Sequence, residues 1–354
     1  MRRRVSYLAL LVAILSVGAL AGAGNAAAAP REFFGLVPQG TEGDRDIERM
    51  AQARVGTARF TVDWPAIEGP DDSFNFAALD AYIGDLAAAG IRPFPVLFGT
   101  APFVNPDPVV LPVTGQAAVE WQEFVRTIAR RYGPGGSFWS QNPSIPEVPI
   151  TTWQAWNEQN GPKHAQPKPA PRKYAKLLKL THSALTEVDP GAEVVLGGMF
   201  GSPRGKGGIK APKFLKGLYK KKGVKKAFEG VAIHPYSPDV KGISQQIKRT
   251  RKVLKQRKDK KADVWITELG WGSSPKGRLG VGTKRQATLL KKSFKLLKKR
   301  RRSWNIGGVM WYTWRDLGEG ESPCDWCRTA GLFQGTGFEP KPAFNKFVRF
   351  TGGS

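Results

Sequence analysis

Two glutamates in this 354-residue chain lie at the ends of apolar segments. Glu158 directly follows Trp156 and Asn157, and Glu268 directly follows Thr267. Two carboxyl groups in one cleft can divide acid–base and nucleophilic work when one is protonated and the other ionised. Cleavage of a glycosidic bond uses such a pair, one carboxyl to protonate the leaving oxygen and one to attack the anomeric carbon.

Other side chains suited to such a site also end apolar segments. An arginine near the attacking carboxylate would keep it ionised, and an amide next to the acid can hydrogen-bond a sugar hydroxyl. Tryptophan offers a flat apolar face on which a sugar ring can stack. The candidates for substrate binding or support are Arg59, Asn157, His234, Tyr236, Trp311 and Trp314.

Eight short apolar segments alternate with helical patterns after the N-terminal region. This alternation is typical of repeated β-α units, and we predict an α/β fold, a single (β/α)8 TIM barrel over residues 30–354. An open doubly wound sheet has the same periodicity and stays an alternative. The expected strands are Phe33–Val37, Val55–Asp63, Arg92–Gly99, Thr152–Glu158, Glu193–Met199, Gly230–Tyr236, Val264–Glu268 and Gly308–Trp314.

The barrel prediction brings the candidate residues together. In a (β/α)8 barrel, the C-terminal ends of all strands meet at one open end, where catalysis takes place. Both glutamates and the six candidate partners lie at such ends. An open sheet would not explain why these polar residues gather at the ends of so many strands.

The sequence also resembles a known group of enzymes. Trp-Asn-Glu at residues 156–158 and Ile-Thr-Glu-Leu-Gly-Trp at residues 266–271 resemble the clan of (β/α)8 glycoside hydrolases with catalytic glutamates on strands four and seven, especially its xylosidase/iduronidase-like and cellulase-like families. The resemblance covers almost the whole mature chain. It implies a retaining mechanism with Glu158 as acid/base and Glu268 as nucleophile. Gln159 departs from the proline that often follows the acid/base in relatives.

By the same resemblance, Tyr236 and Arg59 orient Glu268. His234 and Asn157 contact the sugar, together with Trp311 or Trp314, between which the resemblance does not choose.

Two other functions stay open for such a site. A transglycosylase shares the covalent intermediate and differs only in its acceptor. A carbohydrate- or polyanion-binding barrel with little catalysis would have no need of both glutamates. We expect no cofactor, because the glycine-rich residues 204–208 lack the setting of a phosphate-binding loop, and no metal, because His164 and His182 lack ligand spacing.

The N-terminus has the order of a secretory signal. Three arginines precede an apolar stretch and a run of small residues, so we predict a signal peptide over residues 1–29 and a secreted or cell-surface protein. A retained membrane anchor stays an alternative, because the apolar stretch is only slightly shorter than a membrane span. No membrane span is expected after cleavage. Cys324 and Cys327 are the two cysteines, and export favours a disulfide between them, with free thiols as the alternative.

The formal charge of +26 is unusually high. Lys and Arg crowd the stretches 204–226, 248–261 and 284–302, and apolar residues at helical spacing indicate that many of the charges lie on outer helix faces. Such a field would attract acidic polymers or an anionic cell surface. Few aromatic residues accompany the basic runs, so we expect no specific binding of nucleic acid.

Overall fold

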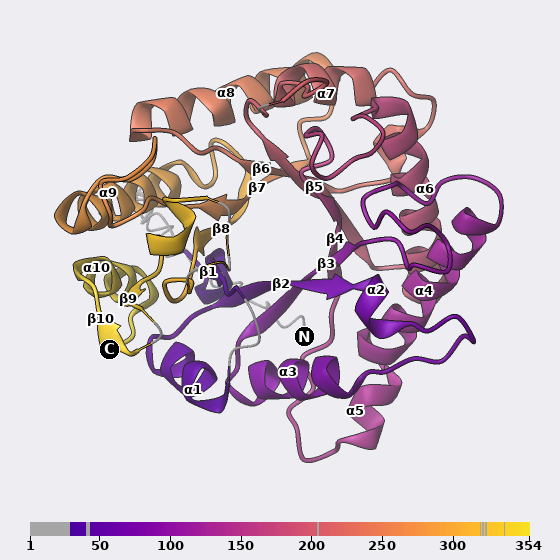
Figure 1. Ribbon diagram of the computed structural model, residues 1–354, viewed down its shortest axis with the longest axis horizontal. Helices are drawn as coiled ribbons and strands as arrows, with labels where there is room; N and C mark the ends of the chain where they lie inside the picture. The colour runs from indigo at the N-terminus through magenta and orange to yellow at the C-terminus, as the bar shows by residue number, and fades with distance from the viewer. Residues whose placement is uncertain are drawn as a thin grey trace, which may run out of the picture.

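The chain forms a closed barrel of eight parallel strands in sequential order, β1 to β8 (Figure 1). The computed structural model describes residues 29–354 except 40–42, 204, 319, 321, 323 and 336. The predicted (β/α)8 barrel is therefore confirmed, and the open doubly wound sheet is wrong. The barrel strands are β1 Phe34–Val37, β2 Thr57–Asp63, β3 Arg92–Phe98, β4 Thr152–Asn157, β5 Glu193–Phe200, β6 Gly230–His234, β7 Asp263–Leu269 and β8 Ile306–Tyr312.

Helices surround the barrel on its outside (Figure 1). A small two-stranded sheet of β9 Phe333–Gln334 and β10 Glu339–Pro340 lies between β8 and the last helix. Single 3-10 turns cover Arg31–Phe33, Val224–Lys226 and Cys327–Thr329. The α-helices are α1 Asp44–Gln52, α2 Trp64–Ile67, α3 Ala77–Ala88, α4 Gln116–Tyr132, α5 Ser137–Gln141, α6 Pro171–Val188, α7 Ala211–Leu218, α8 Val240–Gln256, α9 Thr283–Arg300 and α10 Pro342–Thr351.

Two apolar cores result from the alternation of side chains along the strands. Phe94 of β3, Ala232 of β6, and Met310 and Tyr312 of β8 belong to one buried cluster. These strands are not all neighbours in the barrel, so their side chains can meet only inside it. The intervening residues point outward, and the larger cluster, which includes Trp311, joins the barrel wall to the helices.

Strand ends account for the differences from the prediction. All eight predicted strands exist, but β8 ends at Tyr312, so Trp314 follows the strand instead of ending it.

The predicted signal peptide lies outside the described residues, apart from residue 29. Among the residues that the structure describes, no helix is both long and apolar enough to cross a membrane. The predicted disulfide between Cys324 and Cys327 is confirmed.

Candidate active site

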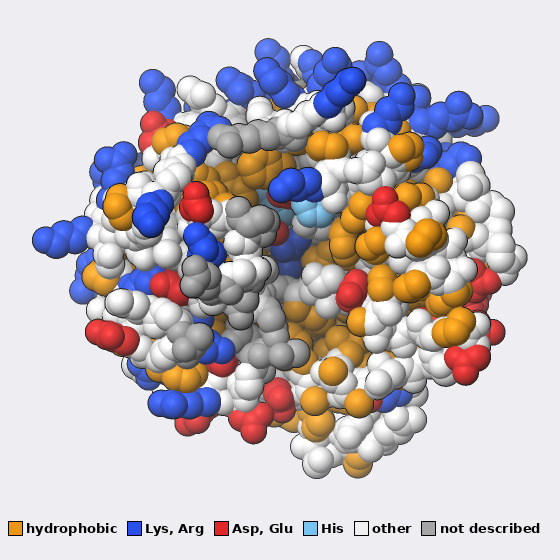
Figure 2. All heavy atoms as spheres, viewed as in Figure 1, with side chains coloured by type: hydrophobic (Ala, Val, Ile, Leu, Met, Phe, Trp, Pro, Cys, Tyr) orange, Lys and Arg blue, Asp and Glu red, His pale blue; other side chains and the backbone are white. Residues whose placement is uncertain are grey.

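Six of the eight predicted site residues meet at the C-terminal end of the barrel. Figure 2 shows a hollow at the centre of this face, with a histidine and charged side chains inside it. Direct contacts link the six residues, which come from β2, β4, β6 and β7 or directly follow them: Arg59, Asn157, Glu158, His234, Tyr236 and Glu268.

Glu268 accepts hydrogen bonds on both of its carboxylate oxygens. Arg59 Nη1 donates to Oε1 over 2.9 Å, and the Tyr236 hydroxyl donates to Oε2 over 2.8 Å. Burial by itself would raise the pKa of this carboxyl. The nearby charges of His234 and Arg59, with the two hydrogen bonds, outweigh burial and hold the pKa of Glu268 below its usual range. Glu268 is therefore kept ionised, as a nucleophile must be.

Arg59 is itself held in place by β4. Its side chain is 5% exposed, its Nε donates to Gln154 Oε1 over 3.0 Å, and its Nη2 donates to Asn157 Oδ1 over 2.7 Å. The planar guanidinium thus bonds three partners in fixed directions, which a lysine ammonium could not reproduce. One buried cation therefore fixes both Glu268 and the amide beside Glu158.

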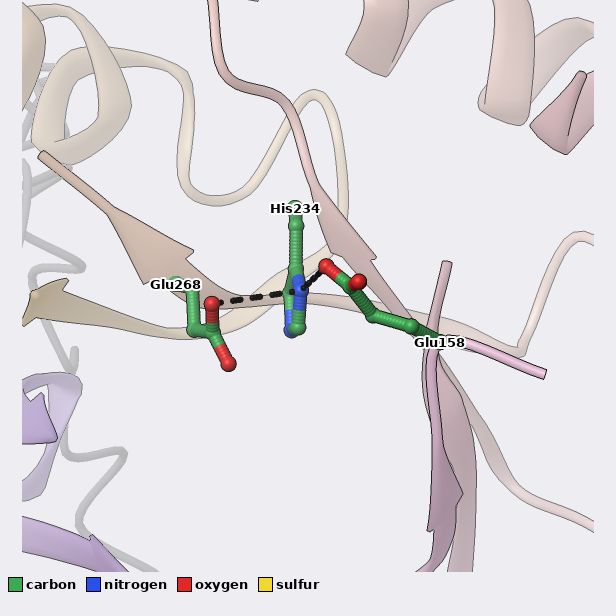
Figure 3. A group of neighbouring side chains, drawn as sticks. All are labelled: Glu158, His234 and Glu268. Carbon is green, nitrogen blue, oxygen red and sulfur yellow. Dashed lines mark hydrogen bonds and ion pairs between the residues drawn. The ribbon is translucent and has the colours of Figure 1, made fainter. Parts of the chain in front are cut away.

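Glu158 contacts two histidines. His234 Nδ1 lies 2.8 Å from Glu158 Oε1 and 3.4 Å from Glu268 Oε2, so the ring stands between the two glutamates (Figure 3). His164 Nδ1 lies 3.5 Å from the other oxygen of Glu158. Thr267 Oγ1, 3.1 Å from Nε2, holds the far side of the His234 ring. Glu158 thus has two neighbours that can exchange protons with it.

The two carboxylates are close together. One carboxylate oxygen of Glu158, one of Glu268 and a ring nitrogen of His234 all lie within 4.8 Å of one another. Carboxyl groups about 5 to 5.5 Å apart serve direct attack, whereas pairs about 6.5 to 9.5 Å apart leave room for a water molecule between carboxylate and sugar. The short separation suits the predicted double displacement.

The backbone is irregular where the glutamates leave their strands. Trp156 and Glu158 have φ of 70° and 44°, a left-handed conformation that is uncommon for residues other than glycine and that gathers at functional sites. The pairing of β7 with β8 shifts register between Ile266 and Leu269. Consecutive residues of a regular strand point to opposite faces, and such an irregularity can redirect a side chain. Thr267 and Glu268 can therefore both reach the site.

Comparison with known proteins finds similarity in structure. No protein-family model matches the chain, and no curated protein has a significantly similar sequence. A family 39 glycoside hydrolase from the gut symbiont Bacteroides cellulosilyticus WH2 has a TM-score of 0.67 at 19% identity, over 90% of this chain and 63% of that one. A family 39 β-xylosidase from Caulobacter crescentus has a TM-score of 0.63 at 18% identity, over 93% and 73%.

A family 51 α-L-arabinofuranosidase from Bifidobacterium longum is similar too, with a TM-score of 0.61 at 13% identity, over 91% of this chain and 73% of that one. The chain shares the fold of glycoside hydrolase barrels. The resemblance to xylosidase-like barrels is thus confirmed at the level of fold. The chain spans 63 to 73% of the length of these three relatives.

The prediction that Trp311 or Trp314 contacts the sugar needs correction, because both side chains are fully buried. Trp311 points outward from β8 to Phe294 of α9, and its Nε1 donates to the Ala330 carbonyl. Trp314 lies beyond the strand and donates to Asp46 Oδ1 over 2.8 Å. Both tryptophans join the barrel to elements outside it.

Two other aromatic residues occupy the position expected of the tryptophans. Tyr312 points into the barrel, and its ring lies 6.4 Å from the Tyr236 ring. Trp326, in the loop after β8, lies 4.9 Å from Tyr236 and 6.0 Å from Tyr312 and is partly exposed. The Cys324–Cys327 disulfide closes the chain around Trp326. This loop thus adds an apolar wall to the site.

Sequence reasoning missed Tyr312, Trp326 and His164 as site residues. Tyr312 lies two residues after Met310 and shares its inward face, but the sequence does not show which face of the strand points inward. His164 lies six residues after Glu158 in the same loop, and burial lowers the pKa of its imidazole against the attraction of the two glutamates. No pattern in the sequence around Trp326 predicts its contact with Tyr236.

Glu158, His234 and Glu268 also have the mutual spacing of possible metal ligands. However, the Arg59 guanidinium already binds Glu268, and its positive charge would repel a metal ion at this position. With Tyr236 on its other oxygen, Glu268 has both oxygens engaged by protein donors. The arrangement suits reacting carboxylates better than a metal centre.

Proposed function

We propose that the protein is a retaining glycoside hydrolase that acts on a β-linked glycan outside the cytoplasm. The observation that carries this proposal is the pair of closely spaced carboxylates in different settings. Glu268 is held ionised by Arg59 and Tyr236, and Glu158 is bonded to His234, which can exchange a proton with it.

The first step forms a bond between a Glu268 oxygen and the anomeric carbon. The bond from that carbon to the leaving oxygen breaks as Glu158 gives this oxygen its proton. In the second step Glu158, now a carboxylate, takes a proton from water, whose oxygen attacks the anomeric carbon and releases Glu268. Two inversions at one carbon retain its configuration.

The β-linkage and the location outside the cytoplasm are supported by other observations. The fold likeness to a family 39 β-xylosidase from Caulobacter crescentus supports a β-linkage. The charged, apolar and small-residue order of residues 1–29 supports export. So does the Cys324–Cys327 disulfide, because disulfides persist in oxidising compartments.

Sugar release from a panel of neutral and uronic-acid-containing β-glycans tests the activity. We expect Glu268→Gln to lower the rate on the cleaved glycan by roughly three to five orders of magnitude. Glu339→Gln changes an exposed glutamate of β10 that has no role in the proposed mechanism; it is the matched control and should retain activity. Equal rates for wild type and Glu268→Gln would refute the nucleophile assignment.

A second variant tests the division of roles. With an aryl glycoside whose leaving group needs no proton, Glu158→Gln still allows attack by Glu268 but lacks the base for the second step. The glycosyl-enzyme should therefore accumulate and be found by mass spectrometry on the peptide that contains Glu268. An adduct on any other carboxylate would contradict the mechanism. Product analysis with added acceptor sugars separates hydrolysis from transglycosylation.

A further inference from the structure

The excess of positive over negative charge lies in one part of the chain. Residues 204–302 contain 32 of the 55 Lys and Arg but 5 of the 29 Asp and Glu, a formal charge of +27. The rest of the chain, with 23 basic and 24 acidic residues, carries −1. The excess charge is therefore a local feature of the C-terminal half of the barrel.

The helices α7, α8 and α9 carry most of this charge and lie next to one another around the barrel (Figure 1). Their apolar faces are buried, with Ile243, Ile247 and Phe294 fully inside, so the basic side chains point to solvent. Lys and Arg side chains crowd the rim of the molecule beside α7 and α8 in Figure 2. We call the exposed Lys and Arg of residues 205–302 the cationic sector.

These charges lack ion-pair partners among the described residues. In the described part of the chain, no Lys or Arg of residues 205–302 forms an ion pair, whereas Arg59, Arg126, Arg131 and Lys341 outside that range all do. Some even face like charges one helical turn away, as Lys291, Lys295 and Lys299 do on α9. Such pairs each cost some helix stability.

A net charge of about 2 to 8 suffices to keep a small domain in solution. A charge of +27 on residues 204–302 is therefore more than solubility requires.

Part of the sector forms a depression of about 470 Å³ lined by Lys225, Lys255, Lys258, Asp259, Lys260 and Lys261. Asp259, the acidic residue of this lining, is buried and accepts a hydrogen bond from Tyr219, and five lysines outnumber it. The lining residues precede β6 and β7, at the end of the barrel opposite the proposed active site. A ligand bound here would leave the site free.

We propose that the cationic sector binds a linear acidic polysaccharide and thereby holds the enzyme on it. That the ligand is a glycan rests on the proposed function. That it is a polyanion rests on the charge of the sector alone. The helices α8 and α9, about 25 and 27 Å long, present the charges in rows that a repeating polyanion can follow.

The composition of the sector disfavours nucleic acid. Residues 204–302 contain 23 Lys and 9 Arg, and lysine lacks the planar fork with which arginine recognises phosphates and guanine. Among the described residues 205–302, no aromatic side chain is exposed for stacking on bases. Carboxylates repeated along a polysaccharide require only positive charge at intervals.

Binding to polygalacturonate tests the proposal, measured in the Glu268→Gln protein so that no chain is cleaved. The sector variant is Lys255→Gln/Lys260→Gln/Lys261→Gln. The matched control removes three exposed charges elsewhere, Arg54→Gln/Arg130→Gln/Arg349→Gln. Both triple variants lower the net charge by the same amount.

We expect the sector variant to bind polygalacturonate about tenfold more weakly at 50 mM salt, the control to bind as the parent does, and raised salt to abolish binding. A neutral β-glucan should not bind to the sector. If both triple variants weaken binding equally, the cationic sector is not the binding site. If duplex DNA binds more tightly than polygalacturonate at the same salt, the ligand is not an acidic polysaccharide. Polymer binding without any glycan cleavage by wild type would refute the proposed function alone.

Discussion

Replacing Arg59 by glutamine should shift the pH dependence of catalysis. Arg59 Nη1 gives Glu268 a hydrogen bond of 2.9 Å between charged groups, an interaction of about 1.5 to 3 kcal/mol. Since about 1.4 kcal/mol corresponds to one pKa unit, losing it should raise the pKa of Glu268 by roughly 1 to 2 units. Glu268 must be ionised to attack, so the acidic limb of kcat/KM should move to higher pH by that amount.

The assay is kcat/KM on an aryl glycoside from about pH 3 to 8, at a temperature where the variant is folded. Folding needs checking by thermal unfolding, because Arg59→Gln removes the buried guanidinium that donates to Glu268, Gln154 and Asn157, at a cost of roughly 3 to 5 kcal/mol. Tyr236→Phe is the matched comparison. It removes a hydrogen bond to the same carboxylate but no positive charge, so its shift should be smaller than that of Arg59→Gln.

Arg59→Lys keeps the charge and should shift the limb less than Arg59→Gln. A folded Arg59→Gln enzyme whose acidic limb coincides with that of wild type would refute the reasoning. If the activity of Arg59→Gln is reduced by the same factor at every pH, then Arg59 acts by positioning Asn157 and not by keeping Glu268 ionised.

Two further predictions concern the aromatic wall and a buried acid. Trp326→Ala should raise KM by roughly tenfold, through lost contact area with the sugar, and leave thermal unfolding nearly unchanged. The double variant Cys324→Ala/Cys327→Ala should raise KM in the same direction, and an unchanged KM in both would exclude Trp326 from the site. Burial raises the pKa of Glu68 to about 7, although Trp64 bonds its ionised form. The folded protein should therefore lose stability as pH rises from about 4.5 through 7. Glu68→Gln should abolish this loss and be roughly 1 to 2 kcal/mol more stable at pH 8, as measured by denaturant unfolding; the same pH dependence in the variant would contradict it.

Much of the barrel could be predicted from the sequence because its signals are local. The strands of a parallel barrel are buried on both faces and appear as short apolar runs, and the helices between them show their own period. The carboxyl ends of those runs then place Arg59, Glu158 and Glu268 at one end of the molecule without any knowledge of distances.

The aromatic contacts of the site could not be predicted in the same way. Which of Trp311, Tyr312 and Trp314 faces inward depends on the parity of β8 and on where it ends, and a one-residue difference reverses every assignment. Trp326 reaches Tyr236 only through the path of an irregular loop, which has no period to read. His164 likewise meets Glu158 through a loop.

The alternation along β8 separates two kinds of evolutionary constraint. Trp311 and its outward neighbours fit between barrel and helices, where a change of volume is costly. Tyr312 and the loop residue Trp326 face the space that a ligand would fill. Mutations at the inward and loop positions could therefore change which sugar is accepted while the packing of the barrel wall stays intact. Adaptation to a new glycan needs no new fold and no repacked core, only substitutions at every second residue of a strand end and in the loop above it.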